Sequence, residues 1–171
     1  MLLAIDTSTA QTGLALFDGS LVLSEMTWRT RQHHTTELAP ALSRLLSWCG
    51  VSMDKVNALG VAVGPGSFTS LRVGLSLVKG IALARHIPVI GIPTLDIIAT
   101  AQPAGKYPLV VVIQAGRKRI AFSKYKCLKN EWQVQGPVRS GTVDDLADEI
   151  ESPTYVAGEL SSEDRSRLAR K

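Results

Sequence analysis

The stretch that decides the fold is residues 60–84, GVAVGPGSFTSLRVGLSLVKGIALA. An apolar run at 58–63 precedes the turn GPGS at 64–67, and an apolar segment at 68–84 follows it. This order predicts a buried strand, a tight turn and a helix with a serine or threonine cap. The turn lacks both the Walker lysine and the glycine spacing of a dinucleotide-binding loop, so a structural turn is favoured over a phosphate site.

The helix predicted at 68–84 carries apolar residues nearly all the way round its surface. Its charged residues, Arg72 and Lys79, are seven positions apart and share one face. Gly74 and Gly80 each cost about 1 kcal/mol relative to alanine inside a helix, which favours a close approach by a neighbouring element. Such a helix is either enclosed within a layered domain or covered on one side by another subunit. The pattern leaves both alternatives open.

The composition is that of a globular protein, with 171 residues, 45% hydrophobic and 20% charged. No apolar run reaches the roughly 18 residues of a membrane span, and the first residues lack a basic leader, so we expect a cytoplasmic protein. Cys49 and Cys127 are isolated thiols without metal-site spacing. The net charge is +4, and the basic excess lies in residues 106–171. A basic surface could bind RNA or an acidic protein, but solvated charges are the favoured interpretation.

The order of predicted elements repeats along the chain. In chain order, we expect strands at 2–6, 13–17 and 21–28, a helix over Leu38–Cys49, the strand and helix described above, a strand at 89–92, a short helix at 95–101, strands at 109–114, 120–125 and 132–138, a helix at 144–150 capped by Thr142, a strand at 155–157 and a final helix after Ser161 or Ser162. Strand-strand-strand-helix-strand-helix thus occurs twice, with a hinge at 102–105. We therefore predict an N-terminal lobe at 1–102 and a shorter C-terminal lobe at 106–171.

Two α/β lobes of this order describe the actin-like, sugar-kinase-like fold, also called the ASKHA or ribonuclease H-like fold. Kinases of this fold use a glycine turn after the first strand to approach phosphate, but here Thr7 occupies that turn. In the second lobe, the segment 114–117 offers the neutral Gln114 where Mg²⁺ prefers a carboxylate. We therefore expect no bound cofactor and no nucleotide chemistry.

Other candidate sites are also weak. His33, His34 and Glu37 lack the geometry of a metal site, and His86 is a lone histidine. Asp6 has no paired acid or histidine and is better explained as a turn cap than as a general base. The serines lack the elbow of a hydrolase. We therefore predict no catalytic residue and no metal ligand.

Several motifs together resemble the bacterial TsaB (YeaZ) family. They are Ile5-Asp6-Thr7-Ser8-Thr9, His34-Thr35 before Leu38-Ala39-Pro40, Gly64-Pro65-Gly66-Ser67-Phe68-Thr69 before Leu71-Arg72-Val73-Gly74, and Pro88-Val89-Ile90-Gly91. Each is weak alone, but the set is specific and covers residues 1 to about 100. The chain departs from the family pattern at Ser70, where glycine is usual, at 114–117, where Asp-Ala-Arg is usual, and in its shorter second lobe.

The resemblance implies a role in adding threonylcarbamoyl to the adenosine next to the anticodon of tRNAs that read codons starting with A. In that family TsaB is a non-catalytic subunit that binds and stabilises TsaD, the metal-holding transferase, and allows the ATPase TsaE to join. It also implies a homodimer when the chain is alone, and contact with tRNA only through the complex. The alternatives are an active small-molecule kinase or a glycoprotease-like enzyme of the same fold, and direct tRNA binding by the basic second lobe.

The resemblance also implies that pairing occurs through helices of the first lobe. This gives a reason for the apolar surface of the helix at 68–84 and of its neighbour, the helix over Thr36–Trp48. The residues predicted at this partner interface are Leu38, Leu42, Leu45, Leu71, Arg72, Leu75, Val78 and Lys79.

Overall fold

The chain divides into two compact units, Met1–Pro93 and Thr94–Lys171. The computed structural model describes residues 1–30, 34–116 and 119–169, without the side chains of His34 and Thr35. Each unit contains one five-stranded mixed β-sheet. Together they form the α/β fold of the ASKHA, ribonuclease H-like class, as the repeated element order predicts.

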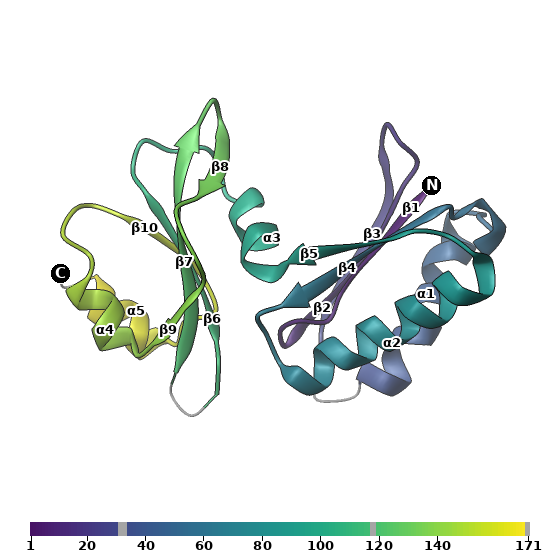
Figure 1. Cartoon of the computed structure of the whole chain (residues 1–171). Coiled ribbons are helices and arrows are strands. Elements are labelled where there is room, and N and C mark those ends of the chain that lie inside the picture. The colour runs from purple at the N-terminus through teal and green to yellow at the C-terminus, as the bar shows by residue number, and fades with distance from the viewer. Residues whose placement is uncertain (31–33, 117–118, 170–171) are drawn as a thin grey trace. The chain divides into compact units, whose positions relative to one another are not determined.

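The first unit is a sheet with two long helices on one face (Figure 1). In chain order its elements are β1 (Leu2–Asp6), β2 (Gln11–Phe17), β3 (Val22–Arg29), α1 (His34–Trp48), the 3₁₀ turn η1 (Met53–Lys55), β4 (Ala58–Gly64), α2 (Phe68–Arg85) and β5 (Val89–Pro93). The strand order is β3-β2-β1-β4-β5. β2 and β3 form the predicted antiparallel meander with β1, whereas β4 and β5 join in parallel. The strand–turn–helix prediction for the opening stretch is therefore confirmed.

Alternation along the strands builds the core of this unit. Leu3 and Ile5 of β1 point toward the helices, together with Leu14 and Leu16 of β2. Successive side chains of a strand point to opposite faces, so every second residue enters the same apolar layer. The leucines of α1 and Val78 of α2 complete this layer from the helix side.

The second unit repeats the order of elements. Its elements are α3 (Thr94–Thr100), β6 (Leu109–Gln114), β7 (Ile120–Leu128), β8 (Glu131–Val134), β9 (Arg139–Gly141), α4 (Val143–Asp148), β10 (Tyr155–Gly158) and α5 (Ser162–Leu168). The strand order is β10-β6-β7-β8. β8 pairs with the last residues of β7, and β9 pairs with its first residues. Figure 1 shows α3 on one face of this sheet and α4 with α5 on the other.

The boundary between the units corrects the predicted lobes. It lies before α3 and not at the hinge 102–105, because Leu95 and Ala99 of α3 pack into the core of the second unit. β6 is buried on both faces, with Leu109 toward α3 and Val110 toward α4. A strand covered on both faces reads as a continuous apolar run.

Two short elements, η1 and β9, were not predicted, and β8 is shorter than the strand predicted at 132–138. β8 stops before Gly136, which has a left-handed backbone with φ of 114°, and before Pro137, which has no N–H to donate to a neighbouring strand. The predicted caps hold: Thr142 caps α4 and Ser161 caps α5, each in a reciprocal capping box. Across the described residues, no helix is both long and apolar enough to cross a membrane.

Candidate partner-binding surface

The structure divides the eight predicted interface residues into two groups. Leu38, Leu42, Leu45 and Val78 are at most 5% exposed and lie in the core of the first unit. The prediction that these four contact a partner is corrected, because an amphipathic helix directs its apolar stripe to its own sheet. Their side chains are not at the surface.

The other four predicted residues lie on α2 at or near its surface. Arg72 and Lys79 are exposed, and Leu71 and Leu75 are half-buried. The guanidinium of Arg72 stands 5.3 Å from the ring centroid of Phe68, a cation–π contact that orders both side chains. One face of α2 is therefore open, while Ser70, Gly74 and Val78 form its buried face.

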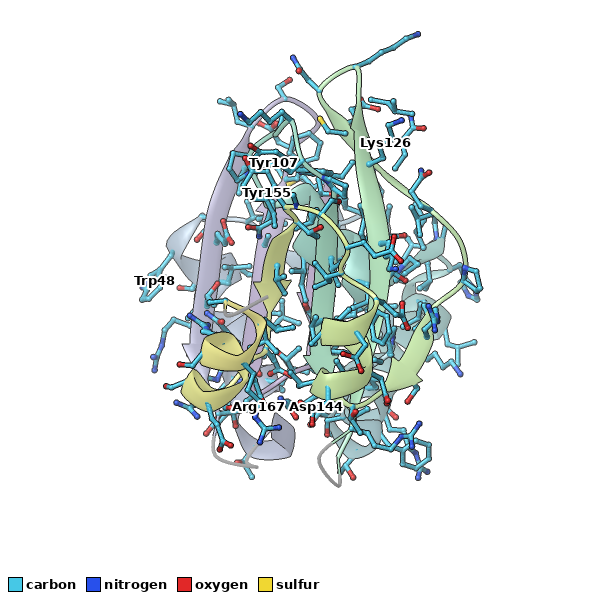
Figure 2. The ribbon with its side chains drawn as sticks, turned by 90° about the vertical axis from the view of Figure 1, so that its left-hand side faces the viewer. Trp48, Tyr107, Lys126, Asp144, Tyr155 and Arg167 are labelled. Atoms are coloured by element: carbon cyan, nitrogen blue, oxygen red, sulfur yellow. The ribbon has the colours of Figure 1, made fainter. Side chains whose placement is uncertain are left out.

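The open face of α2 carries large apolar side chains that the sequence analysis did not select. Phe68 is 74% exposed and Leu83 is 75% exposed. Together with Arg72 and Lys79 they follow spacings of four, seven and four residues, so they form one stripe along the helix. On the neighbouring helix α1, Trp48 is 67% exposed and projects away from the ribbon in Figure 2. We call the exposed residues Phe68, Arg72, Lys79 and Leu83 of α2 the outer helix surface.

A pattern in the sequence could have found this stripe. The buried positions 70, 74 and 78 recur every four residues and are Ser, Gly and Val, small enough to let the helix approach the sheet. The opposite side of a helix with that buried face carries positions 68, 72, 79 and 83. Side chains of Phe and Leu left in water, beside two cations, suit a partner with an apolar patch bordered by acids.

The N-terminal end of α2 is fixed to the turn between β1 and β2. The Oγ1 of Thr7 donates to the carbonyl of Ser70 at 2.7 Å, and the N–H of Ser67 donates to the carbonyl of Ser8 at 2.8 Å. Gly74 makes this contact possible, because a Cβ there would lie 2.5 Å from Thr7 Oγ1. The predicted cap is Ser67, whose hydroxyl accepts from the N–H of Ser70.

The same turn is closed by its own residues. Thr7 is 1% exposed and Ser8 is fully buried. The Oδ1 of Asp6 accepts from the N–H of Ser8 at 2.8 Å and from its hydroxyl at 2.6 Å, which confirms the predicted turn-capping role of Asp6. A side chain at Gly66 would clash with the carbonyl of Ser8. The hydroxyls of Thr7 and Ser8 and the N–H of Ser8 are therefore paired within the protein.

The corresponding turn of the second unit follows β6. The N–H of Gln114 donates to Glu159 Oε2 at 3.2 Å, and its side-chain amide donates to the Glu159 carbonyl at 3.3 Å. Sequence reasoning missed this acid, because Glu159 comes 45 residues after Gln114. Arg117, which completes the predicted segment, lies outside the described residues.

The structure gives other roles to the described residues that were weighed as metal ligands. Glu37 accepts a hydrogen bond from Trp28 Nε1 at 3.0 Å, and His86 ends α2 with a left-handed backbone. His33 and the side chain of His34 lie outside the described residues. Within the described ranges, no group of three or more His, Cys, Asp or Glu residues is placed to hold a metal ion. Cys49 and Cys127 are free thiols.

The chain is similar to proteins of threonylcarbamoyladenosine biosynthesis. The family model described as "TsaD: tRNA N6-adenosine threonylcarbamoyltransferase" matches residues 22–155. The TsaB protein of Escherichia coli is 32% identical over 127 residues, which are 73% of this chain and 54% of that protein. The TsaB protein of Haemophilus influenzae is 38% identical over 129 residues, 72% of this chain and 52% of that protein. The chain thus spans about half the length of these curated relatives.

A solved structure shares the fold over almost the whole chain. YeaZ from Pseudomonas aeruginosa superposes with a TM-score of 0.79 at 24% identity, and the match covers 99% of this chain and 90% of that one. The family model covers more than half of the chain, and two curated relatives are more than 30% identical over more than two thirds of this chain. The chain therefore belongs to the TsaB (YeaZ) family of tRNA threonylcarbamoyladenosine biosynthesis proteins.

Proposed function

We propose that this chain is a non-catalytic subunit that binds the transferase TsaD through the outer helix surface and stabilises its active arrangement. The TsaB–TsaD pair then allows TsaE to join, and tRNA meets the chain within that complex in the cytoplasm. When alone, the chain uses the same surface to form a homodimer. The observation that carries this proposal is the exposure of Phe68 and Leu83 at the two ends of α2.

The outer helix surface supplies part of the energy that a specific contact needs. Complete burial of an exposed Phe or Leu contributes about 1.5–3 kcal/mol. Phe68 and Leu83, both largely exposed, together offer about 3–6 kcal/mol, against an association cost of about 4–15 kcal/mol, so further contacts must contribute. Leu71 and Leu75 lie half-buried beside them and widen the apolar area. The cations Arg72 and Lys79 favour a partner whose contact surface is acidic.

The closed turn between β1 and β2 supports a non-catalytic role. A phosphate group binds where backbone N–H groups are free and no side chain intervenes. Here the N–H of Ser8 is paired with Asp6, the N–H of Ser67 is paired with Ser8, and the side chain of Thr7 fills the space beside Gly74. The kinase alternative would need these groups to be released, and no feature of the described residues favours it or the glycoprotease alternative.

The test is size-exclusion chromatography with light scattering on the chain alone and mixed with TsaD from the same organism. We expect a one-to-one complex that displaces the homodimer. Leu83→Asp should weaken pairing by at least about 30-fold, because burying an unpaired carboxylate costs about 2 kcal/mol or more. The matched control is Leu21→Asp, since Leu21 is 67% exposed in the first unit outside both helices.

Each outcome decides the proposal. Loss of the complex with Leu83→Asp and its retention with Leu21→Asp would support the outer helix surface as the interface. Equal pairing of Leu83→Asp and the unchanged chain would place the interface elsewhere. If the isolated chain turned over a nucleotide, the non-catalytic role would be wrong.

A further inference from the structure

A tyrosine pair with a lysine lies at one end of the second unit. The rings of Tyr107 and Tyr155 have centroids 5.5 Å apart and planes tilted by 60°. The Nζ of Lys106 stands 4.7 Å from the centroid of the Tyr107 ring. We call Lys106, Tyr107 and Tyr155 the tyrosine platform. It lies outside the outer helix surface and has no part in the partner contact proposed above.

The fold builds this platform from two segments that are far apart in the chain. Tyr155 begins β10, and its N–H donates to the carbonyl of Pro108 at 2.8 Å, directly after Tyr107. Gly105 leaves room for the ring, because a Cβ at that position would lie 2.5 Å from Tyr155 Cε2. The ring position of Tyr155 is thus fixed by backbone pairing on one side and by a glycine on the other.

The platform is open to solvent. Tyr155 is 44% exposed, although an aromatic ring of this size gains about 1.5–3 kcal/mol from complete burial. Lys106 covers Tyr107, so the accessible ring of the pair is that of Tyr155. The tyrosine hydroxyl and ring edge together form the amphipathic contact that interfaces favour.

Two further lysines lie toward the same end of the second unit as the platform. Lys126 and Lys129 lie on the hairpin between β7 and β8, and Figure 2 shows Lys126 toward the same end of the unit as Tyr107 and Tyr155. Within the described part of the chain, Lys106, Lys126 and Lys129 form no ion pair. The hairpin also carries the acid Glu131.

The opposite end of the same unit carries charges of both signs. Asp144 and Arg167 are labelled there in Figure 2, and Arg167 is paired with both Asp144 and Glu163 at 3.2 Å. Asp145 and Asp164 close the capping boxes of α4 and α5.

Strand geometry gives the spacing of the platform from these lysines. Tyr155 of β10 pairs with Leu109 of β6, which pairs with Tyr125 of β7. Two strand spacings of about 4.8 Å therefore separate Tyr155 from Tyr125 and its neighbour Lys126. Lys126 points to the face opposite Tyr155. Its proposed part is therefore electrostatic, with its ammonium group extending past the end of the sheet, whereas Tyr155 provides the ring for stacking.

We propose that the tyrosine platform binds RNA, with an unpaired base stacked on Tyr155 and the neighbouring phosphates facing Lys106, Lys126 and Lys129. An exposed aromatic ring beside unpaired lysines is the combination that holds single-stranded nucleic acid. A paired duplex offers no free base face to the ring, so the contact selects loops and ends. This RNA contact rests on the proposed function, in which tRNA meets the complex, and it gives the second unit a direct part in holding that RNA.

The test is fluorescence anisotropy of the isolated chain with a labelled, unmodified tRNA anticodon stem-loop, and with a fully paired RNA duplex of the same length. We expect the stem-loop to bind more tightly than the duplex. Tyr155→Ala should weaken stem-loop binding about tenfold or more, whereas Tyr155→Phe retains stacking and affinity. Lys106→Ala should lower the slope of log affinity against log salt by about 0.7. Lys55→Ala, on the first unit, is the matched control and should change neither quantity.

Three results would overturn the RNA contact: no binding by the unchanged chain, equal binding of stem-loop and duplex, or equal affinity of the Tyr155→Ala variant and the unchanged chain. Tyr155→Phe is the control for an effect on folding, because it keeps the ring in place and removes only the hydroxyl. The pairing assay with TsaD separates this proposal from the proposed function. Loss of RNA binding with intact pairing overturns the RNA contact alone, and failure of pairing with intact RNA binding overturns the partner proposal alone.

Discussion

Two glycines of α2 should respond in opposite ways to the same substitution. Alanine in place of glycine inside a helix is worth about 1 kcal/mol of stability. At Gly80 a Cβ meets nothing within 4 Å, so Gly80→Ala should stabilise the chain by about 0.5–1 kcal/mol. At Gly74 the Cβ would lie 2.5 Å from Thr7 Oγ1, which donates to the Ser70 carbonyl. Losing that buried hydrogen bond costs about 1–3 kcal/mol, and the overpacking costs about 1–3 kcal/mol more.

Gly74→Ala should therefore destabilise the chain by about 1–5 kcal/mol net of the helix gain. The assay is urea denaturation followed by circular dichroism, at concentrations where light scattering shows a monomer. Gly80→Ala is the matched control, because it lies in the same helix and gives the same gain in propensity. The close packing of Thr7 against α2 would be refuted if both variants shifted the urea midpoint upward by the same amount.

The remaining predictions concern buried and capping residues. Val78→Asp should abolish folding, seen as loss of the helical circular dichroism signal, because Val78 is 0% exposed and an unpaired buried charge costs about 4 kcal/mol or more; a folded variant would contradict its place in the core. The backbone N–H and side chain of Thr142 hold the pKa of Asp145 below its ordinary value of 3.8. Its contribution to stability is thus present above that value and lost as pH falls through the lowered pKa, so Asp145→Asn should flatten the acid limb of urea midpoints measured against pH. Burial, and then the hydrogen bond to Asp96, raises the pKa of Tyr125 above its ordinary value of 10.0. Stability from this residue is present below pH 10.0 and lost at higher pH, and a Tyr125→Phe variant with the same alkaline slope of urea midpoints would contradict this assignment.

Much of the architecture could be predicted because the patterns are local. Alternating apolar residues placed the strands of the first unit, and the caps Thr142 and Ser161 marked the starts of two helices. The unit boundary could not be placed in this way. The segment with α3 follows β5 directly, and only the packing of Leu95 and Ala99 against the second sheet assigns it to the second unit.

The interface residues show a different limit of the sequence. A leucine at helical spacing predicts an apolar face but does not say whether that face meets its own sheet or a partner. Leu38, Leu42 and Leu45 are buried in the core of the first unit, so this face of α1 packs against its own sheet. The size of the side chains on α2 decides which of its faces is buried. The face with Ser70, Gly74 and Val78 has room for the close contact between Gly74 and Thr7, so Phe68 lies on the opposite, exposed face.

The strand order of the first unit sets a sequence of events during synthesis. β1 lies inside the sheet, between β2 and β4, and Leu2 pairs with Ala58. At about 5–20 residues per second, roughly 3–11 s separate the synthesis of these two positions on the ribosome. During that interval β1 is paired on the β2 side only, and its other edge is open to chaperones or to a neighbouring nascent chain. All strands of this sheet precede Thr94, so the first sheet can close while the second unit is still being translated.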